Sequence, residues 1–166
     1  MGLLTPLAVR IGAQPWMPRL LPQVVWVDEH LQGWSRGRVS VLDLAGLPNL
    51  MLTVAGRRSG LPRSTPLLCV PFEGSWLVAG SYFGGPRTPV WVFNLRAAER
   101  AEVRVGRRST VVVPEEVSAG PERDRLWAAM VRVWPNYRLY EQKTDRLIPV
   151  FRLTPADAIR PEPDAG

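Results

Sequence analysis

Hydrophobic and polar positions alternate in short runs from residue 50 onward, which is the pattern of half-buried β-strands. Turns such as Glu73-Gly74-Ser75 and Gly106-Arg107-Arg108 separate these runs and are typical of hairpins. The pattern predicts six strands, over residues 50–55, 63–71, 75–80, 101–105, 109–117 and 148–153. A parallel sheet would need crossover helices, for which the hairpins leave no room. We therefore expect a mainly β (α+β) fold, a small antiparallel barrel of about six strands with flanking helices.

Helical periodicity occurs in three places. Residues 89–100 predict a short helix, with Pro89 in its first turn. Residues 121–144 predict a longer helix with apolar residues on one side, which Pro135 kinks or restarts. Residues 20–34 have the spacing of an amphipathic helix. We expect an N-terminal helical segment at 1–45, a barrel domain at 46–155 and a frayed tail at 156–166.

The amphipathic helix in the N-terminal segment has two interpretations. Tryptophans and arginines interleave along residues 1–38, so this segment either covers the barrel or a second copy of the chain, or it touches a membrane surface. The chain shows no secretory signal and no apolar run long enough to span a bilayer. We expect a cytoplasmic protein, with peripheral contact at the inner face of the cell membrane as the alternative.

The composition narrows the kinds of binding partner but does not identify one. The 166 residues fit one domain, and the net charge of +6 favours an anionic partner such as phosphate, nucleic acid or an acidic membrane surface. Of 21 basic residues only Lys143 is a lysine, an imbalance better explained by a GC-rich genome than by nucleic-acid binding. Because no groove-reading motif is present, we expect no nucleic-acid partner.

Cysteine and histidine are nearly absent. Cys69 is the only cysteine and lies within an apolar run, so a small buried strand residue is favoured over a nucleophile. His30 is the only histidine, which makes a histidine-based metal site or a Ser-His-Asp triad improbable. We expect no metal, and we expect a bound cofactor to perform the chemistry.

A basic hairpin tip is the clearest candidate site. The stretch from Leu52 to Leu67 predicts a strand, a turn bracketed by Gly56 and Gly60 where positive φ is tolerated, and a second strand. Backbone N–H groups of such a turn can hold an anion, and guanidinium groups bind phosphate through a fork. A solvated tip with arginines for solubility is the equally open alternative. The polar side chains gathered there are Arg57, Arg58, Arg63, Ser59, Ser64 and Thr65.

Two further segments carry weaker signals. Gly80, Gly84 and Gly85 form a loop around Ser81 that leads toward the helix at 89–100, where a flat ring or an anion could lie. Trp134, Tyr137 and Tyr140 share one helical face. Such a stripe is most often core, although two tyrosine hydroxyls also suit a half-open pocket.

Taken together and in order, the three segments resemble a known family. The motifs LTxxGRxSGxxRxxPL, GSxxGxxxxPxWxxNLxA and ERxxLWxxxVxxxPxYxxYxxKTxRxIPVFxL, from about Gly46 to Leu153, are similar to those of the deazaflavin-dependent nitroreductases and quinone reductases of actinobacteria. The resemblance implies a split β-barrel, the 8-hydroxy-5-deazaflavin coenzyme F420, and hydride transfer to a lipophilic acceptor such as a quinone or a nitroaromatic compound. It also implies a monomer or a homodimer.

The resemblance assigns roles to residues. Ser81, Tyr137 and Tyr140 are the expected catalytic residues, and Ser81, Trp134, Tyr137 and Tyr140 the expected substrate-binding ones. The tail of the cofactor is expected on the basic hairpin and its ring along the following strand, the Ser81 loop and the short helix. The expected cofactor-binding residues are Arg57, Arg58, Ser59, Arg63, Ser64, Thr65, Pro66, Leu67, Leu68, Ala79, Gly80, Ser81, Tyr82, Val90, Trp91, Val92, Phe93 and Asn94.

Two departures from the family pattern bear on the acceptor. Trp134 replaces a tyrosine found in some members, and Phe93 stands where many relatives have histidine. Both make the expected pocket more apolar, which disfavours nitroimidazole-like acceptors more than cofactor binding. The alternatives are a non-catalytic F420-binding or carrier protein and an FMN- or haem-binding split-barrel protein.

Overall fold

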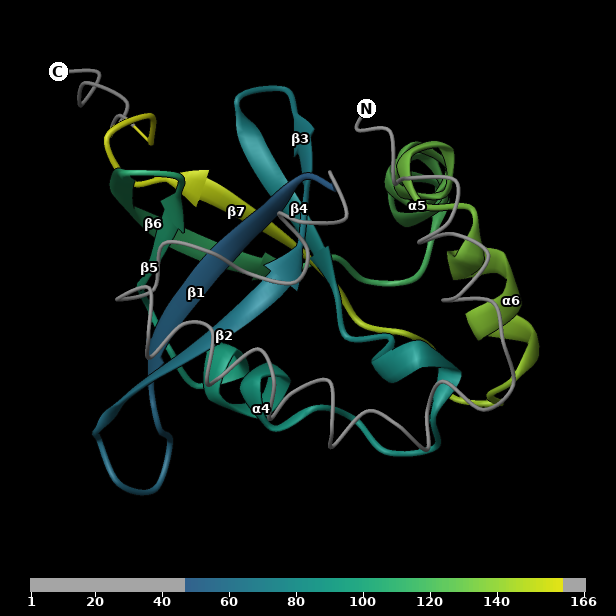
Figure 1. The fold of residues 1–166 in the computed structure, drawn as a ribbon, viewed down its shortest axis with the longest axis horizontal. Helices are drawn as coiled ribbons and strands as arrows, with labels where there is room; N and C mark the ends of the chain where they lie inside the picture. The colour runs from purple at the N-terminus through teal and green to yellow at the C-terminus, as the bar shows by residue number, and fades with distance from the viewer. Residues whose placement is uncertain (1–46, 160–166) are drawn as a thin grey trace, which may run out of the picture.

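The computed structural model describes residues 47–159, and these form one curled antiparallel sheet with helices at its margins (Figure 1). The strand order is β2-β1-β5-β6-β7-β4-β3, and every pairing is antiparallel. The mainly β class is therefore confirmed. The strands are β1 (Asn49–Ala55), β2 (Pro62–Leu68), β3 (Val70–Phe72), β4 (Ser75–Ala79), β5 (Ala101–Val105), β6 (Arg108–Glu116) and β7 (Val150–Pro155).

The prediction of one strand over residues 63–71 is wrong, since two strands occupy this stretch. β2 pairs with β1 as far as Leu68, and β3 pairs with β4 from Val70, so the chain crosses between opposite edges of the sheet through Cys69 alone. The amide of Cys69 donates to the carbonyl of Pro48 at 3.0 Å. The apolar run is continuous across this corner, so hydropathy could not reveal the change of partner. The sheet must curl until its two edges meet.

The two helical stretches predicted within residues 47–159 are present with different lengths, and a short 3-10 helix that was not predicted follows β4. They are the 3-10 helix η1 (Tyr82–Gly84), α4 (Val90–Arg96), α5 (Pro121–Val133) and α6 (Asn136–Gln142). Pro135 separates α5 from α6, as expected of a residue that cannot continue the helical hydrogen-bond ladder. The helix predicted over 89–100 ends at Arg96, because the chain must extend again to begin β5 at Ala101.

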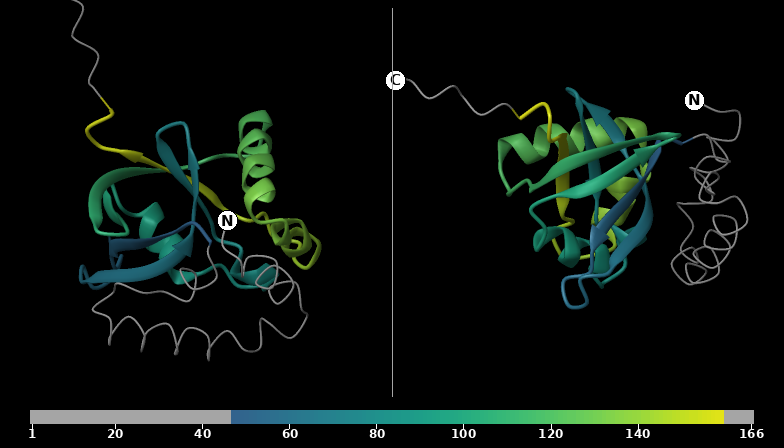
Figure 2. Two further views of the ribbon diagram at one scale, coloured as in Figure 1. Left: turned by 45° about the horizontal axis from the view of Figure 1, so that its top comes forward. Right: turned by 90° about the vertical axis from the view of Figure 1, so that its left-hand side faces the viewer.

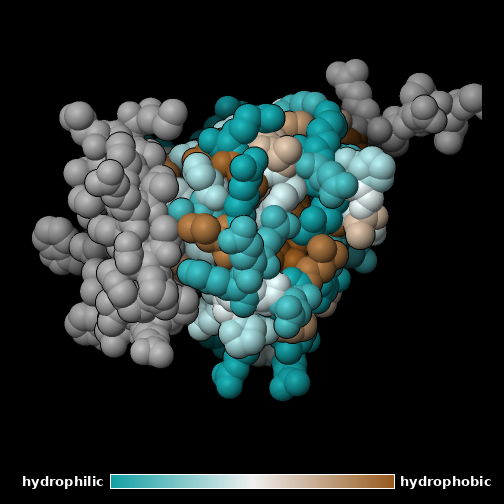
Figure 3. Space-filling view, turned by 90° about the vertical axis from the view of Figure 1, so that its right-hand side faces the viewer, coloured by the Kyte–Doolittle hydropathy of each residue, from teal (hydrophilic) through white to brown (hydrophobic). Residues whose placement is uncertain are grey.

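Two apolar clusters hold the fold together. Alternate residues Leu50, Leu52 and Val54 of β1 point into one cluster, inside the barrel, as period-2 patterning requires. The other cluster joins α5 and α6 to the β3–β4 side of the sheet, with Leu126 and Met130 fully buried. Figure 2 shows α4 beneath the barrel and α5 and α6 beside it. The space-filling view of the α5–α6 side is mostly polar with small apolar patches (Figure 3).

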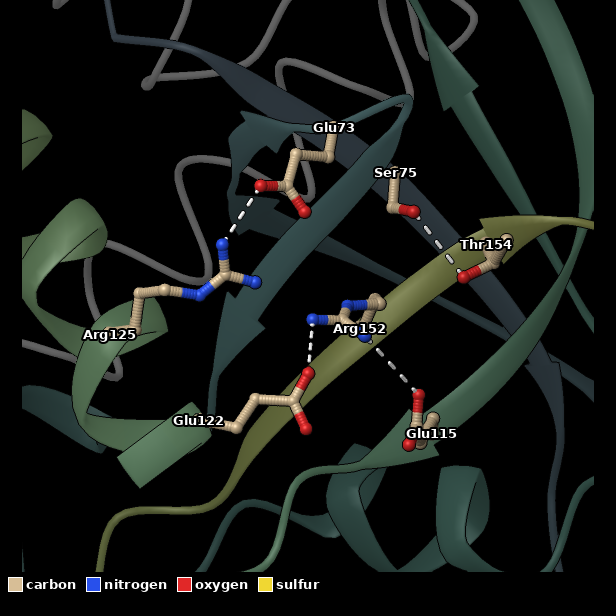
Figure 4. Close-up of polar contacts among 7 residues, drawn as sticks. All are labelled: Glu73, Ser75, Glu115, Glu122, Arg125, Arg152 and Thr154. Carbon is tan, nitrogen blue, oxygen red and sulfur yellow. Dashed lines mark hydrogen bonds and ion pairs between the residues drawn. The ribbon is translucent and has the colours of Figure 1, made fainter. Parts of the chain in front are cut away.

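Polar contacts fix the orientation of α5 against the sheet (Figure 4). Arg152 of β7 reaches Glu122 of α5 at 2.7 Å and Glu115 of β6 at 3.8 Å. Arg125 of α5 pairs with Glu73 in the β3–β4 turn at 2.9 Å. Each pair has at least one largely exposed partner and contributes about 1 kcal/mol or less. They align the helix more than they stabilise it.

The N-terminal predictions fall outside the described residues. The helix at 20–34, the membrane contact of residues 1–38, His30 and the boundary at 45 all lie there, as does most of the tail at 156–166. Within residues 47–159, none of the helices has the length and apolar character needed to cross a bilayer.

We predict that Arg123→Met leaves stability unchanged or raises it by up to about 2 kcal/mol. Arg123 is 5% exposed, its Nη2 donates to the Ile148 carbonyl at 2.9 Å, and its Nε has no hydrogen-bond partner. No acidic residue within 47–159 forms an ion pair with it. Methionine keeps the packing and removes the buried charge.

Urea denaturation of the wild type and of the Met and Ala variants measures this effect. Arg123→Ala is the control and should lower stability, because it also removes the packing of the side chain over the Trp127 ring, whose centre lies 5.2 Å from Cζ. A loss well above 1 kcal/mol in the Met variant would show that the charge itself is needed.

Candidate functional site

The β1–β2 hairpin projects from the sheet (Figure 1). Its three arginines are exposed. Gly56 donates to the Leu61 carbonyl at 2.8 Å, and Gly60 donates back to the Gly56 carbonyl at 2.8 Å. Gly60 has a φ of +68°, as expected, whereas the φ of Gly56 is not positive. A Cβ at Gly56 would lie 2.7 Å from Ser59 Oγ. The tip is therefore a closed turn.

The three arginines of the hairpin differ in their environment. Asn94 of α4 is buried, and its Oδ1 accepts from the backbone N–H of Arg57 at 3.2 Å and from Nη1 of Arg57 at 3.4 Å. The Arg57 guanidinium also lies over the Phe93 ring, 5.1 Å from its centre. Arg58 and Arg63 are exposed, and neither pairs with an acid within residues 47–159. Two cations are thus open to an anionic ligand, and a third is held on α4.

The strand after the hairpin is a half-exposed edge. Thr53 and Ser64 share a hydrogen bond of 2.8 Å across the β1–β2 ladder. Residues 65–68 are intermediate in burial, and they lead from the arginines to the Cys69 corner. β2 is therefore partly accessible along its length, and the cofactor contacts of Thr65, Pro66, Leu67 and Leu68 stay predictions.

The glycine loop after β4 is wedged between two helices. A Cβ at Gly80 would lie 2.7 Å from Val92 Cγ2 of α4, and a Cβ at Gly84 would lie 2.9 Å from the Tyr140 carbonyl of α6. Tyr82, Phe83 and Gly84 have φ values of 47°, 55° and 76° in succession. For Tyr82 and Phe83 this left-handed conformation costs free energy that the surroundings must offset. The loop has little freedom to take another shape.

Ser81 lies at the start of this strained turn and is 9% exposed. Its carbonyl accepts from Arg146 Nη2 at 2.9 Å and from the Gly84 amide at 2.9 Å. Its hydroxyl makes no hydrogen bond with residues 47–159. Arg146 also donates from Nε to the Gly85 carbonyl at 3.2 Å. No role was predicted for Arg146, because its function depends on which carbonyls face it.

The predicted aromatic stripe is core, although Trp134 precedes α6 and only Tyr137 and Tyr140 lie on that helix. Trp134, Tyr137 and Tyr140 are 7%, 3% and 2% exposed, so the structure agrees with the core interpretation more than with a half-open pocket. Trp134 Nε1 lies 3.3 Å from the Tyr140 hydroxyl, and the Tyr137 and Tyr140 rings meet edge to face. Burial raises the pKa of Tyr140 to about 12 and that of Tyr137 further still. Both phenols stay protonated at physiological pH.

Cys69 and the possible metal ligands are the remaining reactive groups. Cys69 is buried, and burial raises the pKa of its thiol to about 12, which favours the inert strand residue over a nucleophile. Among residues 47–159, no cluster of histidine, cysteine, aspartate and glutamate could hold a metal ion.

The structure joins the predicted site residues through α4 and the glycine loop. Asn94 links α4 to the hairpin, Val92 packs against Gly80, and Phe83 lies 5.7 Å from Tyr140, ring centre to ring centre. The residues of α4 differ in exposure: Val90 and Phe93 are exposed, while Trp91 and Val92 are buried. The arrangement offers cations at one end and a glycine-lined backbone at the other, with no nucleophile of its own.

Comparison with known proteins identifies the family of the chain. A family model described as F420H(2)-dependent quinone reductase matches residues 26–155. A Mycobacterium tuberculosis protein named F420H(2)-dependent quinone reductase is 30% identical over 142 residues, which cover 84% of this chain and 95% of the relative.

Two solved structures are also similar. One, described as an F420-H2 dependent reductase, is 36% identical with a TM-score of 0.59 and covers 64% of this chain and 93% of its own. Another, described as a domain-swapped dimer, is 32% identical with a TM-score of 0.61 and covers 77% of this chain and 96% of its own. The chain therefore belongs to the F420H(2)-dependent quinone reductase family, whose cofactor is coenzyme F420.

Proposed function

We propose that this protein transfers a hydride from reduced coenzyme F420 to a quinone-type lipophilic acceptor. The observation that carries the proposal is the pair of exposed cations, Arg58 and Arg63, on a hairpin bound through Asn94 to the helix beside the glycine loop. A ligand with an anionic tail and a flat ring matches this arrangement at both ends.

The residues present fit the cofactor. Arg58 and Arg63 would hold its phosphate and acidic tail, while Arg57, fixed on Asn94, keeps its charge beside them. The ring would lie beside the backbone at Gly80 and Ser81, which α4 holds in place because Gly80 packs against Val92 with no room for a side chain. The other contacts proposed for the ring come from Ser59, Ser64, Thr65, Pro66, Leu67, Leu68, Ala79, Tyr82, Val90, Trp91 and Phe93.

The protein contributes position and exclusion of water rather than a reactive group. When bound, reduced F420 supplies the hydride from carbon 5 of its ring. Ser81 has a hydroxyl with no partner among the described residues, so it is free to hydrogen-bond an acceptor oxygen. Tyr137 and Tyr140 are neutral donors, and with Trp134 they form the apolar support beneath the Ser81 loop.

A nitroaromatic acceptor is the second candidate within the same chemistry. The apolar Trp134 and the exposed Phe93 favour a quinone, since Phe93 has no hydrogen-bond donor for a nitro group and the Nε1–H of Trp134 already donates to the Tyr140 hydroxyl. A homodimer is part of the proposal, supported by the similar structure described as a domain-swapped dimer. Light scattering on the purified chain decides between dimer and monomer.

We expect purified protein to oxidise reduced F420 in the presence of menadione. The fall in reduced cofactor is followed by the absorbance of the oxidised deazaflavin, with p-nitrophenol derivatives as the nitroaromatic comparison. Binding of F420 without turnover of any acceptor would favour the non-catalytic carrier. An FMN or haem spectrum in freshly purified protein, or salt-dependent DNA binding without F420 affinity, would contradict the proposal.

Replacing Arg58 or Arg63 by alanine should weaken F420 binding by about 1–3 kcal/mol each, the range for a lost charge-assisted hydrogen bond. Arg107→Ala, at the exposed turn between β5 and β6, is the control for net charge and should leave affinity within twofold. Cofactor fluorescence titration at fixed ionic strength measures all three. Equal losses in the three variants would mean that net charge, and not the hairpin, attracts the cofactor.

Tyr137→Phe should lower the turnover of menadione by about tenfold or more if its hydroxyl donates the proton, with F420 affinity nearly unchanged. Tyr140→Phe is the comparison, because it also breaks the 3.3 Å contact with Trp134 Nε1. Since burial raises the pKa of both phenols, neither group should add a limb to the pH profile between pH 6 and 9. Full turnover in both variants would assign the proton to Ser81 or to water.

A further inference from the structure

Arg146 connects two carbonyls that lie on either side of the strained turn. Its Nη2 donates to the Ser81 carbonyl at 2.9 Å and its Nε donates to the Gly85 carbonyl at 3.2 Å, so one rigid guanidinium spans residues 82–84. Within this span, three successive residues have positive φ, and two of them are not glycine. The fork therefore closes the turn across its most strained part.

The charge of Arg146 is not used in an ion pair. None of the acids within residues 47–159 pairs with it, and its Nη1 is buried without a hydrogen-bond partner. Burial lowers the pKa of the guanidinium, which reflects the cost of holding a charge there. Such a cost is tolerated where the geometry of the two carbonyl bonds matters more than stability.

The same turn connects the cofactor side and the α6 side of the molecule. Gly80 at its start donates to the Pro149 carbonyl at 2.9 Å, and Phe83 in its middle packs against Tyr140 of α6. Gly84 fits against the Tyr140 backbone with no space for a Cβ. A shift of the turn would therefore move Ser81 relative to both α4 and α6.

We propose that Arg146 is a positioning residue that holds the turn at 81–85 in its left-handed conformation and so fixes Ser81 against the cofactor ring. It does this by donating to the Ser81 and Gly85 carbonyls, without contact to the reacting atoms. The proposal rests on the proposed function for the identity of the ligand. The state of the turn itself can be measured in protein without cofactor.

Hydrogen–deuterium exchange of the cofactor-free protein tests the turn directly. The amides of Gly84 and Gly85 donate within the turn, to Ser81 and Tyr82, whereas the Gly80 amide donates to Pro149. In Arg146→Met we expect exchange at Gly84 and Gly85 to rise about tenfold or more, with little change at Gly80, because two charge-assisted bonds are lost. Arg138→Met, an exposed arginine of α6, is the control and should exchange like the wild type.

Arg146→Lys distinguishes the fork from the charge. An ammonium group keeps the charge but lacks the planar fork that reaches both carbonyls, so exchange should remain well above that of the wild type. It also provides a second folded variant should the Met form not fold. Wild-type exchange at Gly84 and Gly85 in either Arg146 variant would overturn the proposal.

Steady-state kinetics of the Arg146 variants then show whether the turn positions Ser81 for the reaction. With the hairpin arginines intact, F420 affinity should change less than about threefold, while turnover of menadione should fall about tenfold to a hundredfold, as expected from misplacing a reacting pair by about 1 Å. Faster exchange with unchanged turnover would reduce Arg146 to a structural role. Failure of the wild type to bind F420 would contradict the proposed function and leave the exchange result standing.

Discussion

The single-residue corner at Cys69 is the constraint on which the rest of the structure depends. Because β2 and β3 are the two edges of the sheet and only Cys69 separates them, the sheet can form only by curling onto itself. The buried thiol has the small, apolar character that such a corner needs, and its amide bond to Pro48 anchors it beside the start of β1. The chain connection between β2 and β3 therefore requires the barrel to close, and packing of the core then stabilises the closed form.

The corner also determines where the functional groups lie. One continuous stretch runs from Arg63 along β2, around Cys69, through the β3–β4 hairpin and into the glycine loop at Gly80. Closure brings both ends of this stretch against α4, where Asn94 holds the hairpin and Val92 packs against Gly80. The helix thus connects the hairpin that carries the cations to the glycine loop that carries Ser81.

Most of the fold and part of the site could be predicted from the sequence, for definite reasons. Alternation in β1, the turn glycines and Pro135 act locally, so the strands, hairpins and helix break followed from them. The division at Cys69 arises because β2 pairs with β1 and β3 pairs with β4. The hydropathy of residues 63–71 does not show which strand each residue pairs with. Gly56 was assigned positive φ, but of the two glycines that bracket the turn only Gly60 has it. The burial of Tyr137 and Tyr140 likewise depends on packing against α5 and Phe83, not on their spacing.

Arg146 shows why the least predictable residue can be among the most informative. A charged side chain in a motif suggests a ligand, but the guanidinium of Arg146 donates hydrogen bonds to two backbone carbonyls of its own chain. The turn that it closes contains Tyr82 and Phe83 in a conformation they disfavour, so neither local propensity nor charge pattern accounts for the arrangement. A strained turn held by a partly buried cation, whose Nη1 has no hydrogen-bond partner, is not an arrangement that favours stability. The proposed role of Arg146 in holding Ser81 in position accounts for both features.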